Sequence, residues 1–510
     1  MMKKQLPTPV LALLLAGSAI PVAAQEGDVR RELTTVTASE LVWPTPRSLA
    51  RYEDIRGDRL KGFVEELVAI SHRSREAGNK LWGRIAGLPS GEEAQRWVAD
   101  KFRAAGLEVR LEEFELEPQT IPQSWGISVE GAGRTLELSS ASPFIYFGRY
   151  MPAAEAELEL DAVWVGLGLP SDFVGKDVAG KAVFIYSVPT PSSLIQSADW
   201  MGSITRAQEA GAAAIVVVLA IPGNWSYVSH IRGLSQRSKL PVFTVGLDDG
   251  EAVEALNAES LAAGEALKAR LHWKVETKEG LTATNVIGVL PGRTDENIVM
   301  IAHTDSYFEG ANDNGAGTAA LVGVAEYFAK RPRSERRRTM YFIATADHHG
   351  GDRGGAWVHE NLQDVLANAA IVANAEHVAV TAPVWDRTWG TSDRPSLLPT
   401  NELAASWWGV HGSDLLAEIV RDSFAALGVP THLEQGGSAG QLRPVQWDAP
   451  SFYLHNKGVY YHASGDTIDI VPAQGLETAA QAFAKIFDDI NRHDLDELRP
   501  PWWRSSAGSE

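Results

Sequence analysis

The stretch "NIVMIAHTD", residues 297–305, decides the fold class together with the two segments that follow it. It is a short apolar run that ends in polar residues, as a buried strand does. The next segment, "GAGTAALVGVAEYFAK" (residues 315–330), has helical apolar spacing, and "RTMYFIATAD" (residues 338–347) is a second buried strand. Strands that alternate with helices are typical of α/β sheets. We therefore predict an α/β fold with a mixed, mostly parallel sheet and flanking helices over residues 276–495.

Two further segments precede this sheet. Residues 25–123 are predicted to be an N-terminal segment of the same domain, because "GEEAQRWVADKFRAAG" has the apolar spacing of a helix that ends at Gly106. Residues 124–275 have a different sequence pattern, in which short predicted strands such as "AIVVVLA" and "LPVFTVGLDDG" are separated by turns. We predict that they form an inserted, small β-rich α/β domain. Residues 496–510 are predicted to be a loose tail.

The N-terminus has the features of a signal peptide. Lys3 and Lys4 precede the apolar run "VLALLLAGSAI", and "PVAAQ" supplies small residues for cleavage after Ala24. The apolar run is too short to span a bilayer. We therefore predict that residues 1–24 are removed, that the protein is exported to the periplasm or secreted, and that no segment inserts into the membrane.

Composition narrows the classes of partner and of chemistry. The 510-residue chain carries a formal net charge of −19, which argues against a nucleic-acid partner. It has no cysteine, which suits an oxidising compartment and excludes thiolate ligands and a cysteine nucleophile. Any metal must therefore be held by histidine, aspartate and glutamate side chains.

Side chains that could bind a metal follow successive strands of the predicted sheet. Ligands of open α/β sheets gather at the carboxyl ends of the strands, so these side chains are expected to lie together. The set consists of His303, Asp305, Asn312, Asp313, Asn314, Asp347, His348, Glu376 and His462. Imidazole and carboxylate are ordinary ligands of Zn²⁺, so the sequence indicates a metal site at this edge.

These residues carry a resemblance to the M28 family of zinc peptidases with an inserted protease-associated domain. The family motif "GAxDN" is matched by "GANDN" at residues 310–314. The resemblance covers nearly the whole chain after the signal peptide, with residues 124–275 as the inserted domain. It implies that Asp313 bridges two metal ions and that a cis peptide bond precedes Asn314.

The resemblance also implies roles for residues on either side of this motif. The family's His-x-Asp is matched by His303, a metal ligand, and Asp305, the acid that orients it. The family's last histidine, which precedes a turn of small residues and an aspartate, is matched by His462 and Asp466. The implied cofactor is Zn²⁺, with two ions per chain, or one as the alternative.

The chain departs from the family where the family has paired glutamates, a general base followed by a ligand. Asp347 and His348 are expected at those positions, and Glu376 is expected where the family has a ligating aspartate. The resemblance then makes Asp347 the base and gives His349, like Asn314, a supporting contact with the ligands or the substrate. A competing interpretation makes Asp347 a ligand and His348 the base. The implied ligands are His303, Asp313 and Glu376 for one metal, and Asp313, His348 and His462 for the other.

The expected substrate pocket is less closely defined. Four tryptophans between residues 384 and 410 are candidates to line it, with the alternative that they only cover the sheet edge: Trp385, Trp389, Trp407 and Trp408. Ala439 stands where the family has an acid, which indicates a pocket unlike that of a standard aminopeptidase.

We therefore predict an exported, metal-dependent hydrolase of amide or peptide bonds, of the aminopeptidase type. The alternatives are a hydrolase of small-molecule amides on the same fold and a non-catalytic relative that binds peptides. A phosphoesterase is also considered, because "DHH" (residues 347–349) names an unrelated phosphoesterase family, but its other motifs are not visible in the sequence. The oligomeric state and the end of the substrate that is recognised are not predicted.

Overall fold

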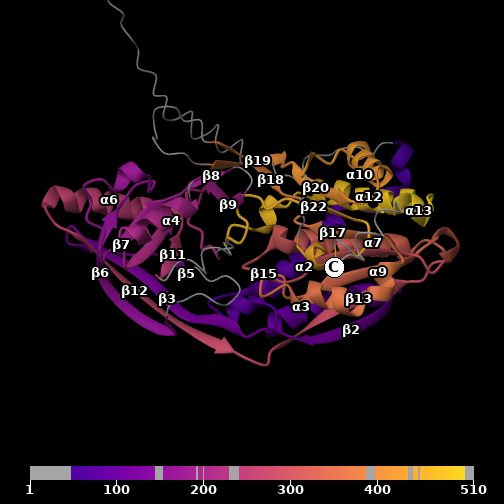
Figure 1. Ribbon diagram of the computed structural model, residues 1–510, viewed down its shortest axis with the longest axis horizontal. Coiled ribbons are helices and arrows are strands. Elements are labelled where there is room, and N and C mark those ends of the chain that lie inside the picture. Colours follow the sequence, from indigo (N-terminus) through magenta and orange to yellow (C-terminus); the bar gives the residue numbers. More distant parts are fainter. Residues whose placement is uncertain are drawn as a thin grey trace, which may run out of the picture.

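The computed structural model describes most of the chain after residue 46, namely residues 47–143, 153–190, 193–198, 200–228, 240–385, 397–434, 440–445 and 448–499. The predicted signal peptide therefore lies outside the described residues. Two eight-stranded sheets lie side by side along the long axis of the molecule (Figure 1). Among the described residues, no helix is both long and apolar enough to cross a membrane.

The first sheet contains the predicted insert. Its strand order is β4-β3-β12-β6-β7-β10-β11-β5. The strands are β3 (Gln119–Gly131), β4 (Arg134–Glu137), β5 (Ser142–Pro143), β6 (Glu155–Trp164), β7 (Ala182–Tyr186), β10 (Ala214–Val218), β11 (Val242–Val245) and β12 (Leu267–Lys278). The sheet thus spans residues 119–278, against a predicted insert of residues 124–275. Its assignment as a protease-associated domain stays a prediction.

The second sheet has the order β2-β13-β16-β14-β17-β22-β20-β21. Its strands are β2 (Glu108–Glu115), β13 (Thr282–Leu290), β14 (Asn297–His303), β16 (Thr339–Thr345), β17 (Ala369–Glu376), β20 (Ser406–His411), β21 (Thr431–Leu433) and β22 (Ser451–His455). The four neighbours β16, β14, β17 and β22 run parallel, while β2, β13 and β20 pair antiparallel with their neighbours. The predicted mixed α/β sheet is confirmed.

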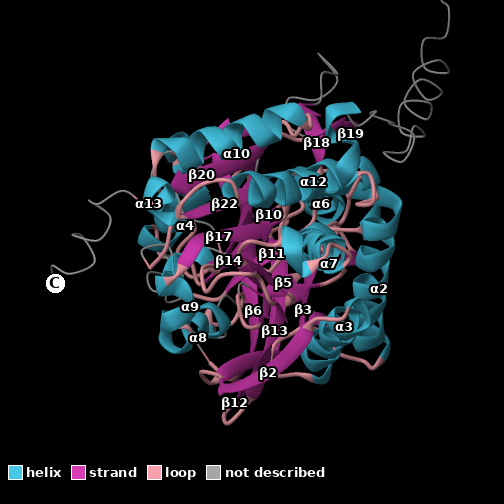
Figure 2. Ribbon diagram, turned by 90° about the vertical axis from the view of Figure 1, so that its right-hand side faces the viewer, coloured by secondary structure: helices cyan, strands magenta, loops and turns pink. Residues whose placement is uncertain are grey.

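Helices cover both faces of this second sheet (Figure 2). Side chains alternate between the faces along β14, so Met300 packs with one group of helices and Val299 with the other. The first group is α2 (Gly57–Glu76), α3 (Pro89–Ala105), α7 (Gly317–Ala329), α10 (Asp414–Ala426) and α12 (Ala473–Ile490). The second group is α8 (Arg353–Asn361), α9 (Gln363–Ala367) and α11 (Leu442–Val445).

The ends of the helical regions differ in how well the sequence predicts them. Helix α3 ends as predicted, with Gly106 in the left-handed conformation at φ 88°. The predicted loose tail, by contrast, begins inside α13 (Leu495–Leu498), and Leu498 is fully buried. Arg499 also donates hydrogen bonds to the backbone carbonyls of Leu366 and Ala367 in α9. The tail therefore does not begin at residue 496.

Residues of the insert reach the second sheet's domain through a short backbone ladder. Tyr227 forms an antiparallel bridge with Ala463. The N–H of Val228 donates to the carbonyl of His462 at 3.0 Å, and the N–H of Ser464 donates to the carbonyl of Ser226 at 2.8 Å. The insert therefore contacts one of the predicted metal ligands directly.

We expect Phe342→Ala to destabilise the domain of the second sheet by about 3–5 kcal/mol, because the ring is fully buried between β16 and α3. Urea unfolding followed by tryptophan fluorescence would measure the change. Leu111→Ala is the matched control, since Leu111 lies in the same sheet but is 51% exposed. Equal losses of stability in the two variants would contradict the packing described.

Candidate metal centre

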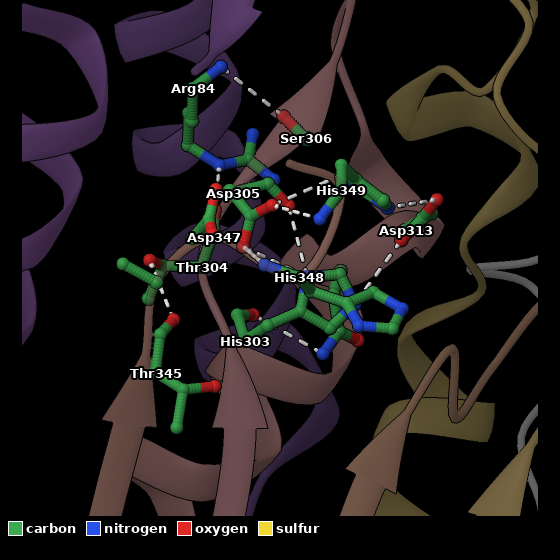
Figure 3. Close-up of polar contacts among 12 residues, drawn as sticks. Arg84, His303, Thr304, Asp305, Ser306, Asp313, Thr345, Asp347, His348 and His349 are labelled. Carbon is green, nitrogen blue, oxygen red and sulfur yellow. Dashed lines mark hydrogen bonds and ion pairs between the residues drawn. The ribbon is translucent and has the colours of Figure 1, made fainter. Parts of the chain in front are cut away.

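The parallel strands bring their carboxyl ends to one place, where the predicted ligands gather (Figure 3). His303 is the last residue of β14, and Glu376 is the last residue of β17. The segment Asp347–His349 follows β16 by one residue. All of these side chains are buried. A group of ionisable side chains has therefore been placed inside the protein, at the edge where α/β sheets bind ligands.

Asp313 lies at the centre of this group, in the single helical turn η4 (Ala311–Ala316). The expected cis peptide bond is present between Asp313 and Asn314. Asp466 accepts hydrogen bonds from the backbone N–H groups of Asn312 and Asp313, at 2.8 and 2.9 Å. The side chain of Asn314 donates to the carbonyl of His303 at 3.2 Å. These bonds fix the Asp313 carboxylate relative to the end of β14.

Four imidazoles surround the Asp313 carboxylate, two at each oxygen. The Nε2 atoms of His303 and His377 lie 3.4 and 2.8 Å from Oδ1. The Nε2 atoms of His349 and His462 lie 3.3 and 3.2 Å from Oδ2. Within the described part of the chain, neither His303 nor His349 forms a hydrogen bond through Nε2. This arrangement suits cations between the rings and the carboxylate, since each oxygen faces a pair of nitrogen donors.

The other ring nitrogen of three of these histidines faces an acceptor. Nδ1 of His303 lies 3.0 Å from the carbonyl of Asp305, and Nδ1 of His462 lies 3.2 Å from the carbonyl of Val228. Nδ1 of His349 lies 3.4 Å from the carboxylate of Asp305. A carbonyl only accepts, so Nδ1 carries the proton in His303 and His462. In the neutral form of either ring the lone pair is then on Nε2, which is the atom that faces Asp313.

The residues that meet at Asp313 differ by one position from two of the predicted ligands. His349 joins His462 at Oδ2 where His348 was expected, and His377 joins His303 at Oδ1 where Glu376 was expected. The backbone explains both differences. Asp347 and His377 have left-handed φ values of 67° and 54°, so the chain turns sharply at both strand ends.

The neighbouring residues His348 and Glu376 also lie within the centre, and His348 offers a ligand atom within 4.8 Å of those of His303 and His349. Nε2 of His348 lies 3.8 Å from the Glu376 carboxylate, and its Nδ1 lies 3.5 Å from Asp352. The rings of His348 and His303 are 4.5 Å apart. His348 therefore lies between two carboxylates, beside the proposed ligands.

Asp347, the predicted base, faces a different part of the site. Its carboxylate accepts a hydrogen bond from the N–H of Arg353 at 3.3 Å, at the start of α8. Together with His349 it lines a small cavity that also contacts Thr120 of β3. The structure therefore does not bring Asp347 to the ring of imidazoles around Asp313.

Burial and the neighbouring charges together determine the pKa values of these groups. Burial, together with the charge of Asp305, raises the pKa of Asp347 well above its ordinary value. Burial and the neighbouring histidines lower the pKa of His348 well below its ordinary value, and burial lowers the pKa of His462 to about 4. Burial opposes the ionisation of Asp313, but His349 and His377 outweigh it and hold its pKa well below the usual range.

Arg84 holds together the two loops that carry His303 and Asp313, and no sequence pattern predicts this role. Its guanidinium, fully buried in the structure, donates to the carbonyls of Thr304, Glu309 and Gly310, at 2.8, 2.7 and 2.9 Å. The carbonyl of Thr304 directly follows His303 in the chain, and the carbonyls of Glu309 and Gly310 lie just before Asp313. His377, the other residue that sequence analysis missed, directly follows a predicted ligand, which is the only local signal for it.

The four predicted pocket tryptophans do not form one group. Trp385 and Trp407 are 39% and 36% exposed. The pocket role predicted for Trp408 is wrong, because its ring is buried in the hydrophobic core, 5.9 Å from the ring of Phe424. Trp389, like Ala439, lies outside the described residues.

Comparison with known proteins identifies the family that this part of the chain resembles. Residues 285–487 match the family described as Peptidase family M28. The resemblance to the M28 peptidases is confirmed. The M28 match runs from β13 to α12 and contains every residue placed here around Asp313, the "DHH" stretch included. The predicted enzyme class, a metallopeptidase, is confirmed at the level of this family.

Relatives of known name or structure extend the similarity to most of the chain. The chain is 26% identical to Aminopeptidase YwaD of Bacillus subtilis (strain 168) over 425 residues, which is 80% of this chain and 82% of that protein. The structure of BSAP, a zinc aminopeptidase from Bacillus subtilis, is similar with a TM-score of 0.57 and 18% identity, over 90% of this chain and 99% of that one. A Peptidase M28 precursor from Shewanella amazonensis SB2B has a TM-score of 0.60 and 17% identity, over 87% and 99%. These structures show that the fold is shared.

We expect Arg84→Lys to lower the free energy of unfolding by about 2–3 kcal/mol, because lysine cannot reach all of the carbonyls that Arg84 holds, and unpaired buried carbonyls are costly. The affinity for zinc should fall as well, since the two loops lose their common support. Urea unfolding and zinc titration would measure the two effects. Arg73→Lys is the control, because Arg73 forms only an exposed ion pair with Glu93. A variant as stable as the control would show that Arg84 does not support the loops.

Proposed function

We propose that the protein is a zinc-dependent hydrolase of peptide bonds, of the aminopeptidase type. The observation that carries this proposal is the buried Asp313 carboxylate with four Nε2 atoms within 3.4 Å of its oxygens. The M28 match and the relatives described as aminopeptidases support the same class of reaction.

The donor set fits two zinc ions. Nitrogen and oxygen donors without thiolates are suitable for Zn²⁺, and burial of several imidazoles without hydrogen bonds at Nε2 costs free energy unless a cation is bound. We propose His303, Asp313 and His377 as ligands of one ion, and Asp313, His349 and His462 as ligands of the other. Zinc, when bound, supplies Lewis acidity toward the scissile carbonyl and the attacking water.

We further propose that His348 transfers the proton in place of Asp347. In the family the base directly precedes a ligand, and His348 directly precedes His349. The lowered pKa of His348 keeps its ring unprotonated before the reaction, so Nε2 is free to accept a proton from the attacking water and return it to the leaving amine. Glu376, 3.8 Å away, and Asp352, 3.5 Å from Nδ1, stabilise the imidazolium that forms between these two events. Glu376 then orients the base instead of binding zinc, and Asp347 has a structural role.

A metal and turnover analysis of three variants tests these roles. His349→Ala should lose one zinc and all turnover of leucine p-nitroanilide. His348→Gln should keep its zinc and lose roughly 10²–10⁴-fold in kcat, because only the proton transfer is removed. Asp347→Asn should keep its zinc and most of its activity. Zinc content by mass spectrometry and steady-state kinetics on the same preparations would provide the measurements.

The same experiment separates the alternatives. A metallated but slow Asp347→Asn variant beside a zinc-depleted His348→Gln variant would restore the assignment expected from the sequence. A wild-type protein that binds zinc but cleaves neither peptides nor small amides would be a non-catalytic relative. Cleavage of small amides without cleavage of peptides would favour the small-molecule hydrolase.

We also propose that the protein acts outside the cytoplasm. The proposal rests on the signal-peptide features of residues 1–24 and on the absence of cysteine from the sequence. We expect the mature protein to begin at Gln25, which N-terminal sequencing of the protein from a cell-envelope fraction would test. An intact N-terminus in the cytoplasmic fraction would exclude export.

A further inference from the structure

Two cations beside the candidate metal centre form no ion pair within the described part of the chain. Lys457 and Arg443 form neither an ion pair nor a side-chain hydrogen bond with any residue that the structure describes. Both residues are partly buried. The nearby Glu434 is already engaged, because it accepts hydrogen bonds from Tyr453 at 2.7 Å and from His455 at 3.2 Å.

Lys457 lies on the loop that joins β22 to His462. Its Nζ is 5.7 Å from the centre of the Tyr461 ring, which stacks on the His462 ring at 3.9 Å and lies 5.2 Å from the His377 ring. The preceding residue, Asn456, donates its N–H to the carbonyl of His377 at 3.0 Å. One aromatic ring therefore separates the ammonium group from proposed ligands of both zinc ions.

Arg443 approaches the same centre from α11. Its N–H donates to the carbonyl of Gly440, at 3.2 Å. Gly440 has a φ of 49° and packs so closely on the Glu376 carboxylate that a Cβ atom there would overlap it. Burial raises the pKa of Asp352 to about 7, and the positive charge of Arg443 partly offsets this effect.

A partly buried cation without a counter-ion is costly unless a ligand supplies the negative charge. An anionic group that is bound next to the zinc ligands would satisfy both cations, with the guanidinium as a bidentate donor. The substrate of a peptidase carries such a group as its C-terminal carboxylate or as an acidic side chain.

We propose that Lys457 and Arg443 bind a carboxylate of the substrate, so that the protein prefers short peptides with a free carboxylate next to the scissile bond. This inference rests on the proposed function, because the same centre performs the cleavage. If so, specificity depends on the part of the substrate that follows the scissile bond as well as on the N-terminal amine.

Three dipeptides test the proposal: Leu-Ala, Leu-Ala amide and Leu-Asp amide. We expect the zinc-loaded protein to have a KM for Leu-Ala about 10-fold to 100-fold lower than for Leu-Ala amide, as is typical for a hydrogen bond to a charged group. Lys457→Met and Arg443→Met should each reduce this preference, and the double variant should abolish it. Lys457→Arg should retain it. Arg492→Gln, which changes an exposed cation two residues after the end of α12, is the control and should leave the preference unchanged.

Leu-Asp amide identifies the source of the carboxylate. A KM near that of Leu-Ala would show that an acidic side chain is accepted, and a KM near that of Leu-Ala amide would show that the C-terminal carboxylate is required. Equal KM values for all three peptides, or a preference that survives in the double variant, would overturn the proposal.

Calorimetry with the metal-free protein separates this proposal from the proposed function. Binding of Leu-Ala that is weakened by Lys457→Met would support the carboxylate site even if the loaded protein cleaves nothing. Turnover of all three peptides with no binding preference would retain the peptidase and exclude the carboxylate site. Thermal unfolding of each variant would verify that the fold is intact.

Discussion

The centre depends on one interaction, the contact of a buried carboxylate with four buried imidazoles. Removing such groups from water costs free energy that only a bound cation or a complete set of hydrogen bonds can offset. The surrounding backbone is arranged to hold the carboxylate despite this cost. Asp466 fixes the turn that carries Asp313, and Arg84 joins that turn to the end of β14 through three carbonyls. The sheet therefore supplies a rigid frame for an electrostatically demanding site.

The sequence predicts which strand ends build the centre, because the apolar runs identify the strands and parallel strands end at the same edge. It does not predict which of two adjacent residues faces the centre. His348 and His349 are chemically identical, and only the left-handed turn at Asp347 decides which ring reaches Asp313. The same holds for Glu376 and His377, where the turn lies at His377 itself. Local backbone conformation of this kind has no periodic pattern in the sequence.

Long-range contacts were the other feature that sequence analysis could not supply. Arg84 lies more than 200 residues before the carbonyls that it binds, and nothing in the surrounding residues distinguishes it from a surface arginine. Trp408 is a pocket candidate because of its neighbours in sequence, yet the alternation of a strand puts Trp407 and Trp408 on opposite faces. In both cases the tertiary structure, and not the local composition, decides the role of the side chain.

The region of the first sheet, residues 119–278, contacts the candidate metal centre directly. The carbonyl of Val228 accepts the Nδ1 proton of His462, which leaves Nε2 of that histidine to face Asp313. The hydrogen bond comes with a ladder in which Ser226 and Val228 pair with residues 462–464, so the ring cannot rotate without breaking several backbone bonds. A domain that is separate in sequence and has its own sheet thus determines the tautomer and direction of one proposed ligand. This contact couples the position of the first sheet's region to the orientation of the His462 ring.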